Sequence, residues 1–150
     1  MKYLTDDVRI TGMEEVIAPE ELIAELPISD QASELIFSNR QQIGQILRNS
    51  DRRLLVIIGP CSIHDPQAAL EYAGRLAELK RKHHEHLHII MRVYFEKPRT
   101  SVGWKGLIND PKLNDSFDVN LGLRVARGVL RDIAELGLGS GTEYLDPITP

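Results

Sequence analysis

Between Leu54 and Gly106 the sequence alternates apolar runs with polar breaks, and this alternation limits the possible folds more than any other part of the chain. An apolar run at 54–58 breaks at 59–65, a helical pattern follows, and a second apolar run at 87–95 breaks into a long polar segment. Two buried strands joined by a helix form the β-α-β unit of a parallel sheet. In α/β barrels and open α/β sheets, ligands bind at the edge where the strands end, and both polar segments lie there.

Four segments, including the helix between the two apolar runs, carry helical spacing or helix-boundary residues. The expected helices cover 19–26, 30–48, 66–82 and 119–136, with Pro19, Asp30 and Asp65 as start signals and Pro27 and Gly137 as stop signals. Residues three, four and seven apart are expected to face the core: these are Ala32, Leu35, Ile36, Ile43, Ile46 and Leu47, then Ala69, Tyr72, Ala73 and Leu76, then Leu123, Ala126, Leu130, Ile133 and Ala134. A third strand is expected over 142–146.

Composition narrows the class of protein. With 42% hydrophobic and 27% charged residues, the chain is typical of soluble globular proteins. A net charge of -4 argues against a nucleic-acid partner, and no apolar run approaches the roughly 20 residues that a membrane span needs. The single cysteine excludes an internal disulfide, and the N-terminus lacks the apolar segment of a signal peptide, so we expect a cytoplasmic location.

The expected elements do not make a closed architecture. Residues 1–50 are interpreted as an N-terminal extension, an extended arm followed by two helices, and 51–150 as a β-α-β-α-β series. Three parallel strands leave two bare sheet edges, and a closed (β/α)₈ barrel typically needs about 250 residues. The chain is therefore expected to be either a small three-stranded α/β layer or, as we favour, the first part of a longer α/β fold.

Four cations gather at the second strand and the loop after it: Arg92, Lys97, Arg99 and Lys105. Glu96 is the only acid in that span. An arginine inside an otherwise apolar strand is unfavourable unless it meets an anion, so a phosphate or carboxylate ligand is indicated. Pro98 stiffens the segment and holds its charges ready. From charge alone, pairing with acids elsewhere or simple solvation of the loop explains the cluster equally well.

Two other residues have open interpretations. Cys61, in the turn 59–65, is either a small buried hydrophobe, a nucleophile or a metal ligand. His64 lies on the same turn at no diagnostic spacing, and the turn is not a P-loop because no Gly-Lys-Ser/Thr follows. Glu143 is either a proton-handling carboxylate at the strand-end edge or a residue of the rim.

Three stretches of the sequence identify a family by resemblance. LLVIIGPCSIHD (54–65), MRVYFEKPRT (91–100) and VGWKGLINDP (102–111) closely resemble class I 3-deoxy-D-arabino-heptulosonate 7-phosphate (DAHP) synthases. The resemblance implies a TIM barrel with an N-terminal extension, so that this α/β chain would form an incomplete TIM (β/α)₈ barrel. It also implies condensation of phosphoenolpyruvate with D-erythrose 4-phosphate and water to give DAHP and phosphate, the first step of the shikimate pathway.

Residue roles follow from that resemblance position by position. Cys61 resembles a metal-ligating cysteine for a divalent metal of the Mn, Fe, Co or Zn type, whose other ligands are expected outside this sequence. Arg92, Lys97 and Lys105 match positions that bind phosphoenolpyruvate, with Lys97 and Cys61 as the catalytic pair. The resemblance further implies erythrose 4-phosphate contacts at Pro98, Arg99 and Thr100, and a water-mediated contact to phosphoenolpyruvate at Glu143.

The resemblance also implies regulation and assembly. An aromatic amino acid effector site is expected at Asp6, Asp7, Tyr144, Asp146 and Pro150, completed across the interface of a homo-oligomer, a dimer or tetramer; the identity of the amino acid stays open. The 150-residue chain alone is expected to be inactive. One alternative is a non-catalytic fragment that retains subunit-association or effector-binding elements. Another is a phosphoenolpyruvate-condensing barrel that acts on a different sugar phosphate.

Overall fold

The structure is a computed structural model that describes residues 3, 5–6, 8–10, 12–99 and 101–145. Four residues of the expected site, Asp7, Thr100, Asp146 and Pro150, lie outside this described part.

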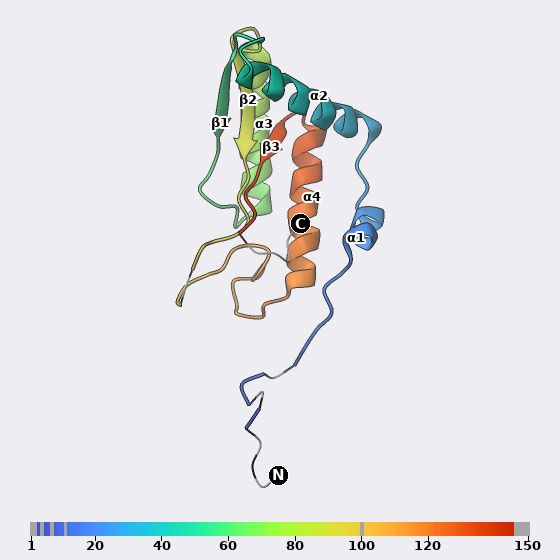
Figure 1. The fold of residues 1–150 in the computed structure, drawn as a ribbon, viewed down its shortest axis with the longest axis vertical. Coiled ribbons are helices and arrows are strands. Elements are labelled where there is room, and N and C mark those ends of the chain that lie inside the picture. The colour runs from blue at the N-terminus through green and yellow to red at the C-terminus, as the bar shows by residue number, and fades with distance from the viewer. Residues whose placement is uncertain (1–2, 4, 7, 11, 100, 146–150) are drawn as a thin grey trace.

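The chain forms a three-stranded parallel sheet with helices between the strands (Figure 1). In chain order the elements are α1 (Pro19–Glu25), α2 (Asp30–Leu47), β1 (Leu54–Ile58), α3 (Pro66–Lys82), β2 (Leu87–Arg92), α4 (Val119–Glu135) and β3 (Gly139–Gly141). The strands stand in the order β1-β2-β3, and both pairs are parallel. This confirms the expected α/β class and β-α-β alternation. No described helix is long and apolar enough to cross a membrane.

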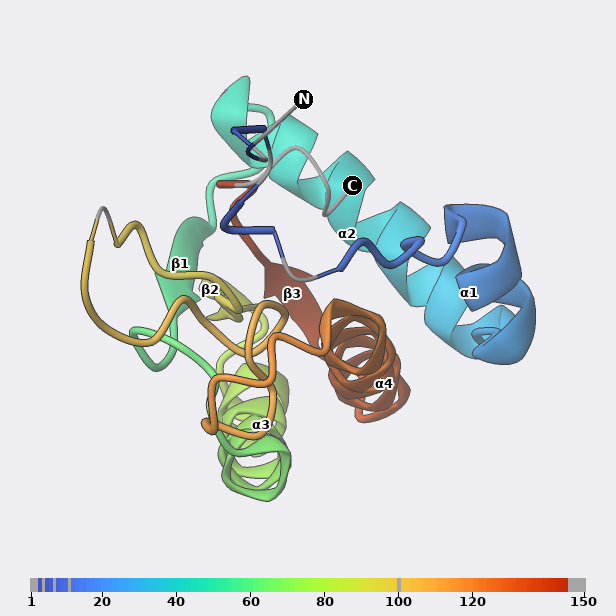
Figure 2. The same ribbon diagram turned by 90° about the horizontal axis from the view of Figure 1, so that it is seen from below.

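The main core lies between the sheet and the two helices that follow its strands. Figure 2 shows α3 and α4 together on one side of the sheet and α2 on the other. Met91 of β2 and Ile133 of α4 are fully buried in this layer, as is Ala73 of α3. The inward positions expected for α4 are confirmed at Ala126, Ile133 and Ala134.

Helix α2 crosses the sheet near the ends where the strands begin (Figure 1). It fits closely there because β3 starts with a glycine: a Cβ on Gly139 would lie 2.9 Å from Nδ2 of Asn39. The expected N-cap of this helix is wrong by one residue. Ser29 is the cap, since its extended backbone lets its side chain accept a hydrogen bond from the Ala32 backbone N–H. Asp30 is instead the first helical residue, where its charge favours the positive end of the helix dipole.

Two strand boundaries differ from the expectation. β2 ends at Arg92 rather than at residue 95, and β3 covers 139–141 rather than 142–146. The third strand was expected in the more apolar segment, but pairing requires the small residues before it. Gly139 pairs opposite Ile90, whose side chain already approaches within 2.8 Å of the position a Cβ would take.

Several expected core residues are exposed. Leu47, the last residue of α2, is exposed because the helix ends there. Tyr72 is exposed in the middle of α3, at the edge of the buried face formed by Ala69, Ala73 and Leu76. β1, expected to be buried, has 64% of Leu54 and 59% of Ile57 exposed. β1 is an edge strand, with β2 on one side only, so it lacks the flanking element that would cover these side chains.

The segment before α1 runs beside α4. Asn120 of α4 binds its backbone at two points, accepting from the Ile17 N–H and donating to the Glu15 carbonyl. One turn further along, Arg124 forms an ion pair with Glu25 at the end of α1 at 2.7 Å. The N-terminal extension is therefore docked on the helix that precedes β3.

His88 gives the fold a pH dependence. It is 2% exposed, and its Nε2 has no hydrogen-bond partner in the described part of the chain. Burial, followed by the charges of Arg53 and Lys80, lowers its pKa below the ordinary value of 6.5, and Asp51 opposes this effect. The unfolded chain therefore takes up a proton at a higher pH than the folded chain does.

We expect the His88 contribution to the free energy of unfolding to be complete above about pH 6.5 and to be lost as the pH falls below that value towards the folded pKa. Urea unfolding at a series of pH values from about 7.5 to about 5.5 measures this slope. His88→Gln should flatten it, whereas the matched change His86→Gln, at an exposed position, should leave it intact. An equal slope in the His88→Gln variant would contradict this assignment.

Candidate functional site

The turn after β1 is held against the end of β2. Gly59 is required there, because a Cβ would lie 2.4 Å from the Arg92 carbonyl oxygen. Four residues later, the Ile63 N–H donates to the Tyr94 carbonyl at 2.7 Å. These backbone contacts place Cys61, between the two anchors, beside the second strand end.

Two cationic side chains lie beside the Cys61 thiol. Lys97 Nζ lies 3.1 Å from Cys61 Sγ, and a guanidinium nitrogen of Arg92 lies 3.9 Å from the same sulfur. The hydrogen bond and charge of Lys97, followed by the charge of Arg92, lower the pKa of the exposed Cys61 thiol below its ordinary 9.0. A thiolate held this way is a better nucleophile or metal ligand than an ordinary thiol.

Arg92 also stacks on Tyr94, with its guanidinium carbon 4.1 Å from the ring centroid. Its Nε is buried and has no partner among the described residues. The guanidinium forms no ion pair with any described acid. This cation is therefore oriented but not neutralised, which is the state expected for an anion-binding group.

The other cations stand on a hairpin-like excursion, residues 96–106. Its base is an antiparallel bridge between Glu96 and Gly106, and the Lys97 N–H donates to the Lys105 carbonyl at 2.9 Å. Gly106 has φ +113°, and a Cβ on it would lie 2.1 Å from the Phe95 carbonyl oxygen, so only glycine closes the hairpin. Lys105 Nζ then reaches the Arg99 carbonyl at 2.5 Å.

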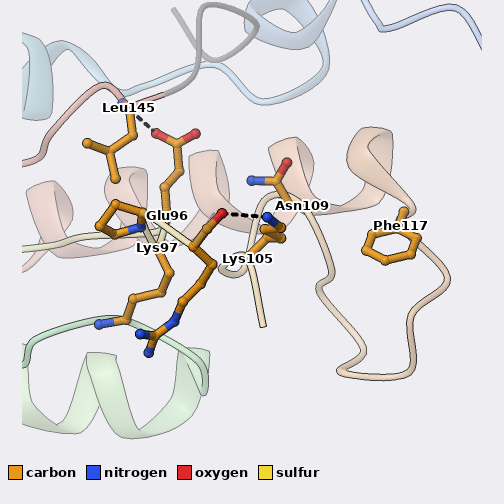
Figure 3. A pocket seen from close by; sticks show the side chains of 8 residues that line it. Glu96, Lys97, Lys105, Asn109, Phe117 and Leu145 are labelled. Atoms are coloured by element: carbon orange, nitrogen blue, oxygen red, sulfur yellow. Dashed lines mark hydrogen bonds between the residues drawn. The ribbon is translucent and has the colours of Figure 1, made fainter. Parts of the chain in front are cut away.

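This hairpin lines a cavity of about 490 Å³ at the strand-end edge (Figure 3). The lining residues are Glu96, Lys97, Pro98, Arg99, Lys105, Asn109, Phe117 and Leu145. Three of them are cations, and the acid among them, Glu96, is buried with its carboxylate turned towards Leu145. The cavity is therefore suited to a small anion.

Comparison with known proteins now identifies the family. A family model described as the DAHP synthetase I family matches residues 25–150. The chain belongs to this family.

Named relatives agree with that assignment. The phospho-2-dehydro-3-deoxyheptonate aldolase of Haemophilus influenzae is 54% identical over 97% of this chain and 40% of its own length. The Phe-sensitive aldolase of Escherichia coli is 52% identical over the whole chain and 43% of its own length. A solved structure of the Francisella tularensis aldolase superposes with a TM-score of 0.90 at 49% identity, over 94% of this chain and 41% of that one. The chain thus spans about two fifths of the length of these relatives.

Of the described residues that the DAHP synthase resemblance selects, the structure brings together most, but not all. Cys61, Arg92 and Lys97 form one contact group, and Lys97, Pro98, Arg99 and Lys105 line the cavity. The remaining three lie apart from both groups. Glu143 is half-buried after β3, Asp6 is exposed on the arm, and Tyr144 is exposed beside a separate cavity under α2.

Four residues that line the cavity were not predicted from the sequence. Glu96 was counted only as an opposing charge, although an acid among four cations was a usable signal. Asn109, Phe117 and Leu145 gave no such signal, because they reach the cavity only through the folding of the loop and of the segment after β3.

Proposed function

We propose that this chain carries the substrate-binding segment of a DAHP synthase, which condenses phosphoenolpyruvate with erythrose 4-phosphate and water to give DAHP and phosphate. The observation that supports this most is the pair of cation groups at one strand-end edge: Arg92 and Lys97 at the Cys61 thiol, and Arg99 and Lys105 with Lys97 at the cavity. Lys97 belongs to both groups. It therefore connects the two places where an anion can bind.

The reaction requires two mutually repelling anions to meet. Both substrates carry a phosphate, and phosphoenolpyruvate carries a carboxylate as well. Preplaced cations lower that repulsion without reorganising at the moment of reaction. Arg92, fixed by stacking on Tyr94, offers a fork that fits a carboxylate or phosphate, and Lys97 adds a point charge beside it. The two would orient the enol carbon towards the aldehyde of the second substrate.

The hairpin positions the second substrate. Pro98 and the bond from Lys105 Nζ to the Arg99 carbonyl hold that segment in one shape. Arg99 then contributes the charge that takes the sugar phosphate, as the resemblance implies. Proton handling falls to Lys97, which among the described cations is the one that contacts the thiol and also lines the cavity.

A divalent metal belongs to the proposal as well. Cys61 fits as a ligand, because its thiol is exposed and its pKa is lowered by two cations. Among the described residues no group of three or more His, Cys, Asp or Glu side chains gathers to complete a site. A metal held at Cys61 would supply a Lewis acid for the aldehyde or for water.

The surrounding architecture is part of the same proposal. We infer that 1–50 is an extension and 51–150 the first part of a (β/α)₈ barrel, with the exposed edge of β1 pairing to a further strand. Relatives named Phe-sensitive and Trp-sensitive support an aromatic effector. The proposal also includes assembly into a homo-oligomer and a cytoplasmic location.

A chimera tests the activity. Residues 1–150 are joined to the part of the Escherichia coli Phe-sensitive relative that follows its matching segment, and phosphate release from phosphoenolpyruvate is measured with erythrose 4-phosphate and a divalent metal. We expect turnover by the chimera and none by the 150-residue chain alone. Lys97→Ala should lower chimera turnover by at least about 100-fold, because it removes a charge that acts on the transition state.

The matched control is Lys82→Ala, at an exposed position at the end of α3, which should leave turnover unchanged. A folded chimera with no turnover, tested beside an active Escherichia coli parent, would refute the proposed activity. Replacing erythrose 4-phosphate with other sugar phosphates in the same assay tests for a different acceptor.

The alternative function is an assembly fragment. Its support is the exposed apolar edge of β1 and the docked N-terminal segment, whose Ile23 and Ile28 are exposed. Mixing the tagged chain with the full-length Escherichia coli relative and measuring co-purification separates the two functions.

A further inference from the structure

The burial of Glu96 is unusual for a charged residue. It is 4% exposed, yet it stands at the base of the cationic hairpin 96–106. A buried carboxylate is unfavourable unless hydrogen bonds or a cation satisfy it. Its Oε2 accepts a hydrogen bond from the Leu145 N–H at 3.0 Å, and its Oε1 has no partner among the described residues.

Neutralisation of the neighbouring lysines does not explain this residue. Lys97 Nζ is directed to the Cys61 sulfur, and Lys105 Nζ to a backbone carbonyl. Figure 3 shows the Lys97 side chain pointing away from the Glu96 carboxylate, which faces Leu145. No ion pair in the described part of the chain includes Glu96.

The Glu96 bond connects two segments that are otherwise separate in the chain. On one side, Glu96 pairs with Gly106, and its neighbour Lys97 pairs with Lys105 through the backbone, so the hairpin base moves with the carboxylate. On the other side, Leu145 lies four residues beyond the end of β3 and lines the same cavity. A shift of the chain at Leu145 therefore displaces the lysines.

We propose that Glu96 is a positioning residue that couples the conformation of the chain at Leu145 to the placement of Lys97 and Lys105 for an anionic substrate. The inference rests on the proposed function, since it takes Lys97 and Lys105 to bind phosphoenolpyruvate. Coupling of this kind is reciprocal: an anion that fixes the hairpin must also protect the Leu145 N–H.

Hydrogen exchange of the Leu145 amide in the 150-residue chain measures this coupling, with phosphoenolpyruvate as the probe ligand. In the unchanged chain we expect phosphoenolpyruvate to slow that exchange by at least about five-fold. Glu96→Ala should make the exchange fast with or without ligand and weaken phosphoenolpyruvate binding about ten-fold, as the lysines lose their placement. Glu96→Gln keeps an oxygen acceptor and should retain the slowing.

Glu85→Ala, an exposed acid outside the hairpin, is the matched control and should change neither measurement. If Glu96→Ala loses the fold, Leu145→Pro removes the same hydrogen bond from the donor side. Residue 145 then has no amide hydrogen, so the measurement is phosphoenolpyruvate affinity, which should again fall about ten-fold. In the chimera, Glu96→Ala should raise KM for phosphoenolpyruvate while kcat stays nearly constant.

The outcomes separate the two proposals. Normal affinity and ligand-dependent Leu145 exchange in the Glu96→Ala variant would overturn the coupling and leave the proposed function standing. Absence of phosphoenolpyruvate binding by both the unchanged chain and the chimera would overturn the proposed function, and the coupling with it.

Discussion

Gly122→Ala is expected to lower the free energy of unfolding of this chain by more than about 3 kcal/mol, whereas Gly128→Ala in the same helix is expected to raise it by roughly 0.5–1 kcal/mol. Both glycines stand inside α4. A Cβ on Gly122 would lie 2.0 Å from the Ile108 carbonyl oxygen and 2.6 Å from its carbon, whereas a Cβ on Gly128 has nothing within 4 Å.

The difference arises because the obstacle at Gly122 is backbone, which cannot rotate aside as a side chain can. Ile108 is buried in the core and follows the hairpin by two residues. Separating it from α4 would therefore also move Lys105. Urea unfolding of the two variants beside the unchanged chain measures both effects. Equal stability of the two alanine variants would show that α4 does not pack against the loop at this distance.

How far the sequence predicts the fold depends on whether a feature has a local signal or, like the contact between Gly122 and Ile108, joins residues from separate segments. Helix starts and stops were accessible because their signals are local: Asp65 caps α3 and Pro66 begins it, and Gly137, with φ +80°, follows α4. The third strand was not, because Gly139 and Gly141 form it through pairing with β2 rather than through any preference of their own. Secondary-structure propensity does not indicate at which glycine another part of the chain packs too closely to leave room for a Cβ.

The candidate site, too, could be predicted from the sequence only where the signal was local. Charge along the chain was enough to single out the cations and to assign them to one edge of a parallel sheet. The contact between Lys97 and Cys61 joins residues 36 positions apart, and the bond between Glu96 and Leu145 joins residues 49 apart. Such pairings depend on strand order and on the closing of the hairpin at Gly106. Residue type and spacing therefore indicated where the cations gather but not the contacts through which the protein holds them.

Arg92→Leu provides the second large effect, a loss of binding with little change in stability. On the proposed function, loss of the guanidinium removes charge-assisted hydrogen bonds to phosphoenolpyruvate, about 3 kcal/mol or roughly 100-fold in affinity. The free energy of unfolding should change by less than about 1 kcal/mol, because the lost stack on Tyr94 is offset by the removal of a charge whose buried Nε has no partner among the described residues.

Arg53→Leu is the matched control, since it removes the same charge at a position where that charge is paired within the protein. Arg53 donates to both carboxylate oxygens of Asp51 and to Gln42. Its loss leaves the Asp51 carboxylate without its partner and should lower the free energy of unfolding, while phosphoenolpyruvate affinity stays unchanged.

Urea unfolding of the chain and calorimetric titration of the chain and the chimera with phosphoenolpyruvate measure the two quantities for each variant. Replacing a residue that serves packing lowers the stability of the protein, whereas replacing a residue that serves ligand binding lowers the affinity for the ligand. If Arg92→Leu lowered stability and left affinity intact, Arg92 would belong to the first kind. The stacked but unneutralised guanidinium beside Cys61 would then be a structural feature of the strand end, and the anion site would have to be sought on the hairpin alone.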